Sequence, residues 1–300
     1  MQLPPIPDDI RRQVLEWSGD DGRQWLDSVP GTAERLVDQW GLAPTGGPFE
    51  GGTHSYVLPV DRDGEDAVLK VIYRDEENAA EPTALRDYDG DGAVRLYEYE
   101  AETGAMLLER VMPGTELLEH DFGPEDDRAT WRRRVESACG LYRRLWRAPG
   151  QSDGFPAYPL ATDLLADLER HFEKLESPWR ERGQDLCRTL ADPGEVGIAN
   201  RDTHLGNIIA SDREPWLLID PKPYLAERAF DAGYFVFRQL EYGIALGTPE
   251  LVRIVAENLG ADRERVKAWA AVRALAEAAE AGPGEYHDSC AGVVADIERA

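Results

Sequence analysis

Two aspartates and an asparagine in the second half of the chain have the residue types and spacing that phosphoryl transfer needs. Asp202 and Asn207 lie in the polar segment 200–207, and Asp220 ends the later apolar run 217–219. Phosphoryl transfer requires a carboxylate that orients the attacking hydroxyl and accepts its proton, and it requires hard oxygen ligands that hold Mg²⁺ on a triphosphate. The order and spacing predict Asp202 as the catalytic base, with Asn207 and Asp220 as metal ligands.

Each of these residues has a simpler interpretation when it is taken alone. Asp202 by itself would be a loop aspartate that caps a turn. That interpretation is disfavoured because Asn207 and Asp220 follow in the required order. His204 lies in the same loop, and no second histidine or cysteine is suitably spaced for a metal site, so we expect it to form hydrogen bonds that support the loop.

A single lysine interrupts an apolar strand upstream. Residues 67–72 read Ala-Val-Leu-Lys-Val-Ile, and a lysine buried in such a strand is costly unless it is paired. In kinases the corresponding lysine contacts the nucleotide phosphates and is oriented by a glutamate on the next helix. We expect Lys70 to pair with Glu81, with Glu76 and Glu77 as competitors. The alternative is an edge-strand lysine that points to water.

A glycine-containing turn precedes the Lys70 strand. Gly51, Gly52 and Ser55 lie in the segment 49–55, and small residues there would let backbone N–H groups approach phosphate oxygens. Gly-Gly is also ordinary hairpin chemistry. The position of the turn, just before the strand, favours the phosphate-binding interpretation.

The tripeptide Asp121-Phe122-Gly123 has the same sequence as a kinase metal-binding motif, but its position in the chain does not fit that role. It precedes Asp202, whereas the metal aspartate should follow the catalytic loop. A helix start is expected directly after it. We therefore expect Asp121 to serve in loop or cap chemistry.

Apolar periodicity indicates a small sheet-rich lobe followed by a larger helical lobe. The spacing predicts a helix over 8–40, an antiparallel meander over 42–72, a helix over 75–88 and strands at 93–97 and 105–108. After Pro113-Gly114 it predicts helices at 124–147, 160–175, 180–190, 231–246, 249–258 and 262–281, with short strands at 196–198, 208–210 and 216–219. The expected fold class is α+β, with a nucleotide-binding lobe at 1–112 and a lobe at 113–300 that carries the catalytic loop and the acceptor site.

Composition narrows the possible partners. A net charge of −25 argues against nucleic acid, because neutralising phosphates needs a basic surface. Such a charge could attract a cationic small molecule, or it could only keep the chain in solution. No apolar run reaches the roughly 18 to 20 residues of a membrane span, and the N-terminus lacks signal-peptide features, so we expect a cytoplasmic protein without membrane contact.

The three cysteines indicate neither a disulfide framework nor a zinc site. Cys139, Cys187 and Cys290 are odd in number and widely separated, without a C-x-x-C spacing. We expect them to behave as small buried hydrophobic residues.

Three segments resemble a known family. Residues 216–224 read Trp-Leu-Leu-Ile-Asp-Pro-Lys-Pro-Tyr, which resembles the metal-aspartate strand of aminoglycoside phosphotransferases, in the branch of streptomycin 6-kinases and hydroxyurea-resistance kinases. Asp-Gly-Asp-Gly-Ala-Val-Arg-Leu at 89–96 and Leu-Leu-Glu-Arg at 107–110 also resemble that branch. The resemblance runs from about residue 49 to 231, roughly three fifths of the chain.

The resemblance implies a protein-kinase-like two-lobe fold, with ATP and Mg²⁺ as cofactors and transfer of the γ-phosphoryl group to an alcohol of a small molecule. It implies the same roles for the catalytic loop and for Lys70 as the spacing does. It adds that the backbone near Glu109 and Val111 holds adenine, and that Asp231 supports the catalytic loop.

One departure bears on the acceptor. The family usually has His-Gly before the catalytic aspartate, whereas this chain has Asn200-Arg201. We expect activity to survive, with Asn200 and Arg201 altering the floor of the acceptor pocket. Further expected contacts to the ammonium groups of a cationic acceptor are Trp269, Glu277 and Glu280, although these acids could instead form a solvated face.

The function expected from these observations is an antibiotic-resistance kinase for a hydroxyl of a cationic aminoglycoside or aminocyclitol, acting as a monomer or dimer. One alternative is a kinase of an amino sugar or of an antibiotic-biosynthesis intermediate. A second alternative, from another class, is a non-catalytic nucleotide-binding pseudokinase.

Overall fold

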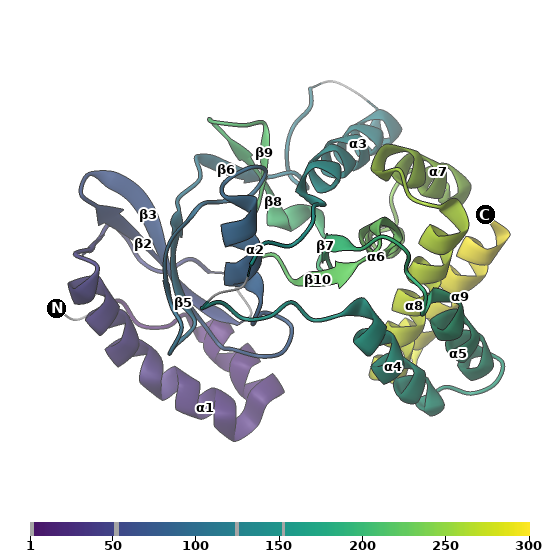
Figure 1. The fold of residues 1–300 in the computed structure, drawn as a ribbon, viewed down its shortest axis with the longest axis horizontal. Helices are drawn as coiled ribbons and strands as arrows, with labels where there is room; N and C mark the ends of the chain where they lie inside the picture. Colours follow the sequence, from purple (N-terminus) through teal and green to yellow (C-terminus); the bar gives the residue numbers. More distant parts are fainter. Residues whose placement is uncertain (1–2, 51–53, 124–125, 152–153) are drawn as a thin grey trace. The chain divides into compact units, whose positions relative to one another are not determined.

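The structure is a computed structural model that describes residues 3–50, 54–123, 126–151 and 154–300. The chain forms two units, Met1–Met112 with Ser152–Pro156, and Pro113–Gln151 with Ala157–Ala300 (Figure 1). Among the described residues, no helix is long and apolar enough to cross a membrane.

The first unit is built on a five-stranded antiparallel sheet in the order β1-β2-β3-β5-β4. Its strands are β1 (Ala43–Pro44), β2 (Ser55–Arg62), β3 (Glu65–Ile72), β4 (Leu96–Glu100) and β5 (Ala105–Glu109). Strands β2 and β3 pair from Ser55 opposite Ile72 to Arg62 opposite Glu65. The two residues between them, Asp63 and Gly64, both have positive φ angles, as a tight hairpin turn of this length requires.

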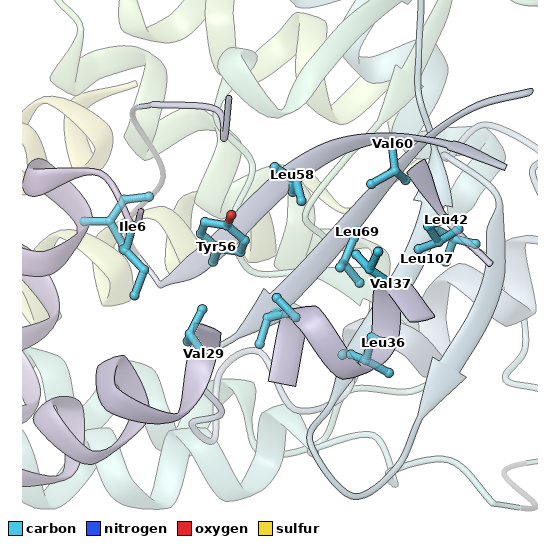
Figure 2. Close-up of a cluster of buried hydrophobic side chains, with 14 of the residues drawn as sticks. Ile6, Val29, Leu36, Val37, Leu42, Tyr56, Leu58, Val60, Leu69 and Leu107 are labelled. Atoms are coloured by element: carbon cyan, nitrogen blue, oxygen red, sulfur yellow. The ribbon is translucent and has the colours of Figure 1, made fainter. Parts of the chain in front are cut away.

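Helix α1 (Asp8–Gln39) covers one face of this sheet. Its backbone is bent at Gly19, where φ is 50° and ψ is −122°. Figure 2 shows Val29, Leu36 and Val37 of α1 directed toward side chains from the strands. Those strand residues are Tyr56, Leu58 and Val60 of β2, Leu69 of β3 and Leu107 of β5. This burial holds the sheet on which the predicted phosphate-binding lysine lies.

Alternation along β3 places the lysine on the opposite face. Ala67, Leu69 and Val71 belong to the core under α1, so Lys70 points the other way. It meets α2 (Glu81–Tyr88) there. Helix α2 begins later than the predicted residue 75 because the Asp75 carboxylate accepts backbone hydrogen bonds and holds a turn. The predicted strand at 93–97 also begins later, at Leu96 in β4.

The second unit is mainly helical. Its helices are α3 (Asp127–Leu145), α4 (Ala161–His171), α5 (Trp179–Leu190), α6 (Arg228–Glu241), α7 (Thr248–Leu259), α8 (Arg263–Ala281) and α9 (Glu285–Arg299), with short 3₁₀ turns η1 (Phe172–Lys174) and η2 (Leu205–Asn207). Helices α8 and α9 run beside each other (Figure 1). The predicted helix at 231–246 begins and ends earlier, as α6.

Two small sheets in the second unit carry the predicted chemistry. One pairs β7 (Gly197–Asn200) with β10 (Pro223–Ala226), and the other has the order β6-β8-β9, with β6 at Pro113–Glu116, β8 at Ile208–Ser211 and β9 at Trp216–Leu218. The elements β6, β10 and α9 lie outside the sequence predictions. All three cysteines are free and buried.

Candidate active site

The loop between β7 and β8 holds Asp202 and Asn207, and the strand end before Asp220 pairs with the end of this loop. Asn207 ends η2, and its Nδ2 donates to Oδ2 of Asp202 at 3.3 Å. The backbone carbonyl of Asn207 accepts from the N–H of Ile219 at 2.9 Å, so Asp220 is the next residue after this contact. Asp220 has a φ of 51°, in the left-handed region, which turns the chain sharply at the end of β9. The local hairpin of β8 and β9 thus places the second aspartate beside the catalytic loop.

Asn200 ties the catalytic loop to the segment that follows Asp220. Its Oδ1 accepts from the backbone N–H groups of Asp202, at 3.3 Å, and Lys222, at 2.9 Å, while its Nδ2 donates to the carbonyl of Asp202 at 2.9 Å. Asn200 is only 2% exposed. The amide of Asn200 is therefore buried and engaged within the loop, and its contact with the acceptor stays a prediction. Arg201, which is partly exposed, stays a predicted acceptor contact.

Asp231 lies beneath the loop at the start of α6. Its Oδ1 accepts from the backbone N–H of Asn200 at 2.6 Å, which is the geometry that a supporting role requires. The side chain is almost wholly buried. Burial raises the pKa of Asp231 well above its usual value, and the hydrogen bond from Asn200 and the charge of Arg228 oppose that rise only in part.

We expect Asp231→Asn to change how stability depends on pH. Because the native pKa of Asp231 exceeds its unfolded value of about 3.9, the native state binds the extra proton between the two values. The contribution of Asp231 to stability is therefore present below about pH 4 and is lost as the pH rises through the native pKa. Asparagine keeps the acceptor oxygen but does not ionise. The free energy of unfolding of the variant, minus that of the wild type, should increase from about pH 4 toward pH 8 in urea titrations. Parallel pH profiles would contradict this assignment.

Three nitrogen atoms approach the same oxygen of Asp202. Besides Asn207 Nδ2, the Nζ of Lys222 lies 3.6 Å and the Nε2 of His204 lies 3.7 Å from Oδ2. The His204 distance exceeds that of a hydrogen bond. Lys222 is a site residue that the sequence predictions lack. Its signal was its position two residues after Asp220, inside the Pro-Lys-Pro segment.

Further charged and phenolic groups face the catalytic loop from β6 and α6. A Cβ at Gly206 would lie 3.1 Å from Oε2 of Glu116, so this carboxylate packs against the loop. Burial raises the pKa of Tyr242, and the charges of Glu241, Asp202 and Glu116 raise it further, while Arg238 opposes them. Arg238 also forms an ion pair with Glu241. Tyr242 is therefore within electrostatic range of Asp202, Glu116 and Glu241, and Arg238 opposes their effect.

The predicted substrate contacts on α8 have mixed outcomes. Trp269 is 1% exposed, and its Nε1 donates to Glu227 at 2.9 Å. Trp269 is therefore a core residue with its indole N–H engaged, and its contact with the acceptor stays a prediction. Glu277 pairs with Arg273 and accepts from the hydroxyl of Tyr286, at 3.4 Å, which also donates to Glu241. Glu280 lies 3.4 Å from His171, with its side chain largely exposed.

In the first unit, Lys70 pairs with Glu81. Its Nζ lies 2.7 Å and 2.8 Å from the two carboxylate oxygens, and the two residues are 6% and 0% exposed. Glu81 is thus the partner, ahead of Glu76 and Glu77, and the lysine is not directed to water. Contact between this pair and nucleotide phosphates stays a prediction.

The structure describes only some of the other residues predicted to contact the nucleotide. Gly51 and Gly52 lie outside the described residues, and Ser55 is buried at the start of β2. The backbone N–H of Glu109 donates to the carbonyl of Arg95 at 2.9 Å. The predicted adenine contact with the backbone near Glu109 and Val111 stays a prediction.

The Asp121 side chain serves in the loop, as expected. Its Oδ1 accepts from the N–H of Gly123 at 2.8 Å, which closes a local turn. The cap of α3 is instead Asp126, which accepts from Ala129 at 2.8 Å. The tripeptide at 121–123 is thus accounted for by local structure.

Comparison with known proteins identifies a family and several relatives of this chain. A family model described as aminoglycoside/hydroxyurea antibiotic resistance kinase matches residues 39–283. A hydroxyurea phosphotransferase from Kitasatospora aureofaciens is 36% identical over 273 residues, which cover 88% of this chain and 76% of that protein. A streptomycin 6-kinase from Streptomyces glaucescens is 31% identical over 290 residues, which cover 92% of this chain and 91% of that protein.

Solved structures support the fold. A thermostable mutant of an aminoglycoside phosphotransferase, in ternary complex with ADP and hygromycin B, superposes with a TM-score of 0.60 at 13% identity. The match covers 89% of this chain and 96% of that one. At this identity the likeness shows the fold, which is a protein-kinase-like α+β fold with a sheet-rich lobe and a larger helical lobe.

Proposed function

The chain belongs to the aminoglycoside/hydroxyurea antibiotic resistance kinase family, and from this premise we propose that it transfers the γ-phosphoryl group of ATP to a hydroxyl of a small polar molecule. It is a small-molecule kinase. The observation that carries the proposal is the hydrogen bond from Asn207 to Asp202, together with the hairpin that joins Ile219, the residue before Asp220, to the backbone of Asn207. The buried Lys70–Glu81 pair supplies the second part that phosphoryl transfer needs.

In this proposal Asp202 is the general base. Its Oδ2 receives nitrogen contacts, so Oδ1 is the oxygen that would accept the proton of the acceptor hydroxyl. Buried support from Asn200 and Asp231 fixes the backbone on which the carboxylate is mounted. Such positioning is most of what an enzyme contributes to phosphoryl transfer.

The residues present fit Mg²⁺. Asn207 uses Nδ2 to hold Asp202, which leaves its Oδ1 for a hard cation, and Asp220 adds a carboxylate. In the part of the chain that the structure describes, no group of three or more His, Cys, Asp or Glu side chains could hold a metal. Mg²⁺ usually takes one or two protein ligands and completes its shell with phosphates and water, so Asn207 and Asp220 would suffice to hold it. When bound, the ion neutralises phosphate charge during transfer.

The surroundings of Asp202 favour an acceptor that carries positive charge. Glu116 packs against the loop, and Glu241 lies within electrostatic range of the same tyrosine as Asp202. Arg238 and Lys222 each neutralise part of this charge, so the acceptor need not carry many positive charges. A cationic aminoglycoside or aminocyclitol fits these groups. A second candidate acceptor is hydroxyurea, which is neutral, because a hydroxyurea phosphotransferase is 36% identical to this chain.

The test is a phosphorylation assay on purified protein with ATP and Mg²⁺. The acceptor panel contains streptomycin, other aminoglycosides, neutral and amino sugars, and hydroxyurea, and products are identified by mass spectrometry. We expect a phosphorylated product from a cationic member of the panel. Product from hydroxyurea alone would overturn the charge argument, and product from amino sugars alone would favour a metabolic or biosynthetic role. Nucleotide binding without product from any acceptor would favour the pseudokinase alternative.

A further inference from the structure

The side chain of Lys222 lies at the reacting carboxylate, and its backbone is held on both sides. Its Nζ is 3.6 Å from Oδ2 of Asp202. Its N–H donates to Oδ1 of Asn200 and its carbonyl accepts from the N–H of Arg201, each at 2.9 Å. These bonds join Lys222 to the strand end that precedes the catalytic loop. The fixed backbone therefore keeps the Lys222 ammonium within reach of Asp202, although the side chain itself keeps some freedom.

The exposure of the two side chains suits a group that meets a substrate. The side chain of Lys222 is 21% exposed and that of Asp202 is 18% exposed. The ammonium is thus largely withdrawn from water, which strengthens its electrostatic effect, yet it is not sealed in the core. The buried Lys70–Glu81 pair is different, with side chains only 7% and 1% exposed.

Lys222 supplies positive charge to a region that is otherwise rich in negative charge. Asp202 lies 3.6 Å from the ammonium and Asp220 is two residues before Lys222 in the chain, and a nucleotide triphosphate would bring further negative charge. In the transition state of phosphoryl transfer, charge is spread over the equatorial oxygens of the transferred group. A lysine ammonium is a compact point charge on a flexible stem, so it can contact the carboxylate first and a phosphoryl oxygen later.

We propose that Lys222 is a catalytic residue, whose ammonium forms an ion pair with Asp202 and stabilises the transferred phosphoryl group. This inference rests on the proposed kinase function. In the step, the acceptor oxygen bonds to the γ-phosphorus while the bond from that phosphorus to the β–γ bridging oxygen breaks. The bridging oxygen leaves with the electron pair on ADP, and the hydroxyl proton passes to Oδ1 of Asp202. Lys222 takes no part in the proton transfer.

A structural role for the Lys222–Asp202 pair makes a different prediction. Partly exposed ion pairs contribute little to stability, typically about 0 to 1 kcal/mol. Removal of the ammonium should therefore leave folding and nucleotide affinity nearly unchanged. Loss of one preorganised donor to a developing charge, by contrast, typically costs about 10²- to 10³-fold in kcat. The two roles are distinguished by a test that restores the positive charge at position 222 in one arm and only side-chain size in the other.

The experiment uses Lys222→Cys and chemical modification. The three native cysteines are buried, and burial raises the pKa of the Cys187 thiol to about 12 and that of the Cys290 thiol to about 11, so a thiol at position 222 should be alkylated first. Bromoethylamine restores an ammonium at nearly the length of lysine, whereas iodoacetamide adds a neutral group. Lys174→Cys, at an exposed lysine in η1, receives the same treatments as a control.

We expect Lys222→Cys to lower kcat about 10²-fold with the KM for ATP changed less than about threefold. Bromoethylamine should restore at least about a tenth of the wild-type kcat, and iodoacetamide should not. Lys174→Cys should stay at the wild-type rate throughout. Lys222→Met provides a second neutral variant if the cysteine variant folds poorly.

Equal recovery with both reagents would overturn the proposal, because it would assign Lys222 to packing. So would a kcat within about threefold of wild type in Lys222→Cys or Lys222→Met. Either result would leave the kinase function standing, since the wild type would still form product. Absence of product from the wild type with every acceptor would overturn the proposed function and the role of Lys222 with it.

Discussion

Asp202→Ala is expected to lower kcat by about 10²- to 10⁴-fold, because it removes the carboxylate that accepts the proton of the acceptor hydroxyl. The dissociation constant for the nucleotide should change little, since the proposed nucleotide contacts lie at Lys70 and Glu109. Product formation under saturating ATP and isothermal titration with a non-hydrolysable ATP analogue measure the two quantities. Loss of turnover with retained nucleotide binding would separate chemistry from binding. The pseudokinase alternative predicts no turnover to lose.

The neighbouring contacts make Asp202→Asn a useful companion variant. Asparagine keeps the shape of the side chain and an acceptor for Asn207 Nδ2, but it does not take up a proton at neutral pH. If Asp202 only orients neighbouring groups, this variant should retain most of the activity. A loss as large as that of the alanine variant would support the role of base.

Asp121→Ala is the matched control for the catalytic aspartate. Asp121 belongs to the tripeptide that resembles a kinase metal-binding motif, yet its carboxylate closes a local turn with Gly123. We expect kcat to stay within about twofold of wild type, because a surface turn contributes nothing to transition-state binding. A loss comparable to that of Asp202→Ala would transfer the metal role to Asp121 and would contradict the assignment of Asp220.

The closeness of Asp202 to Asn207, and of Asn207 to the strand end before Asp220, could be predicted from the sequence because their arrangement is local. Asp202, Asn207 and Asp220 lie within one short stretch of chain that folds as loop, 3₁₀ turn and hairpin, so order and spacing nearly determine their proximity. The Lys70–Glu81 pair was predictable for a related reason. A charged residue in an apolar strand must be matched, and the next helix begins with a glutamate.

The roles of Asn200 and Trp269 could not be predicted in this way. The amide of Asn200 reaches Lys222, 22 residues along the chain, through the pairing of β7 with β10, and β10 is a strand without a clear alternating pattern. Trp269 donates to Glu227 across 42 residues. An aromatic residue on a helix has the same appearance in a sequence whether it lines a pocket or fills a core.

The helix and strand that the sequence predictions missed were missed for different reasons. Helix α9 buries Cys290, Val294 and Ile297, whose spacing is helical, so its signal was present but lay beyond the Gly-Pro-Gly that ends α8. Strand β6 was hidden because Pro113-Gly114 is typical of a turn. The strand forms through long-range pairing with β8, and only two Cα partner pairs define its register.

Lys70→Met is expected to destabilise the first unit by about 3 to 5 kcal/mol, because it leaves the fully buried Glu81 without its cation. The size of the effect follows from asymmetry. Removing both charges costs little when apolar groups fill the space, whereas removing one leaves the desolvation of the other uncompensated. Lys70→Met/Glu81→Met should therefore recover most of the lost stability. Hydrogen exchange of the amides in β3 and α2 reports the stability of this unit directly.

Activity should behave differently from stability in this double variant. If Lys70 contacts the nucleotide phosphates, the doubly substituted protein should be folded and yet bind ATP weakly, with kcat/KM for ATP lower by about 10²-fold or more. Arg62→Met is the matched control, since Arg62 pairs with Glu98 at 2.9 Å on the same sheet with both side chains more than a third exposed. This exposed pair should contribute less than about 1 kcal/mol. Full activity in the double variant would show that the buried pair serves folding alone, and the nucleotide role of Lys70 would then be wrong.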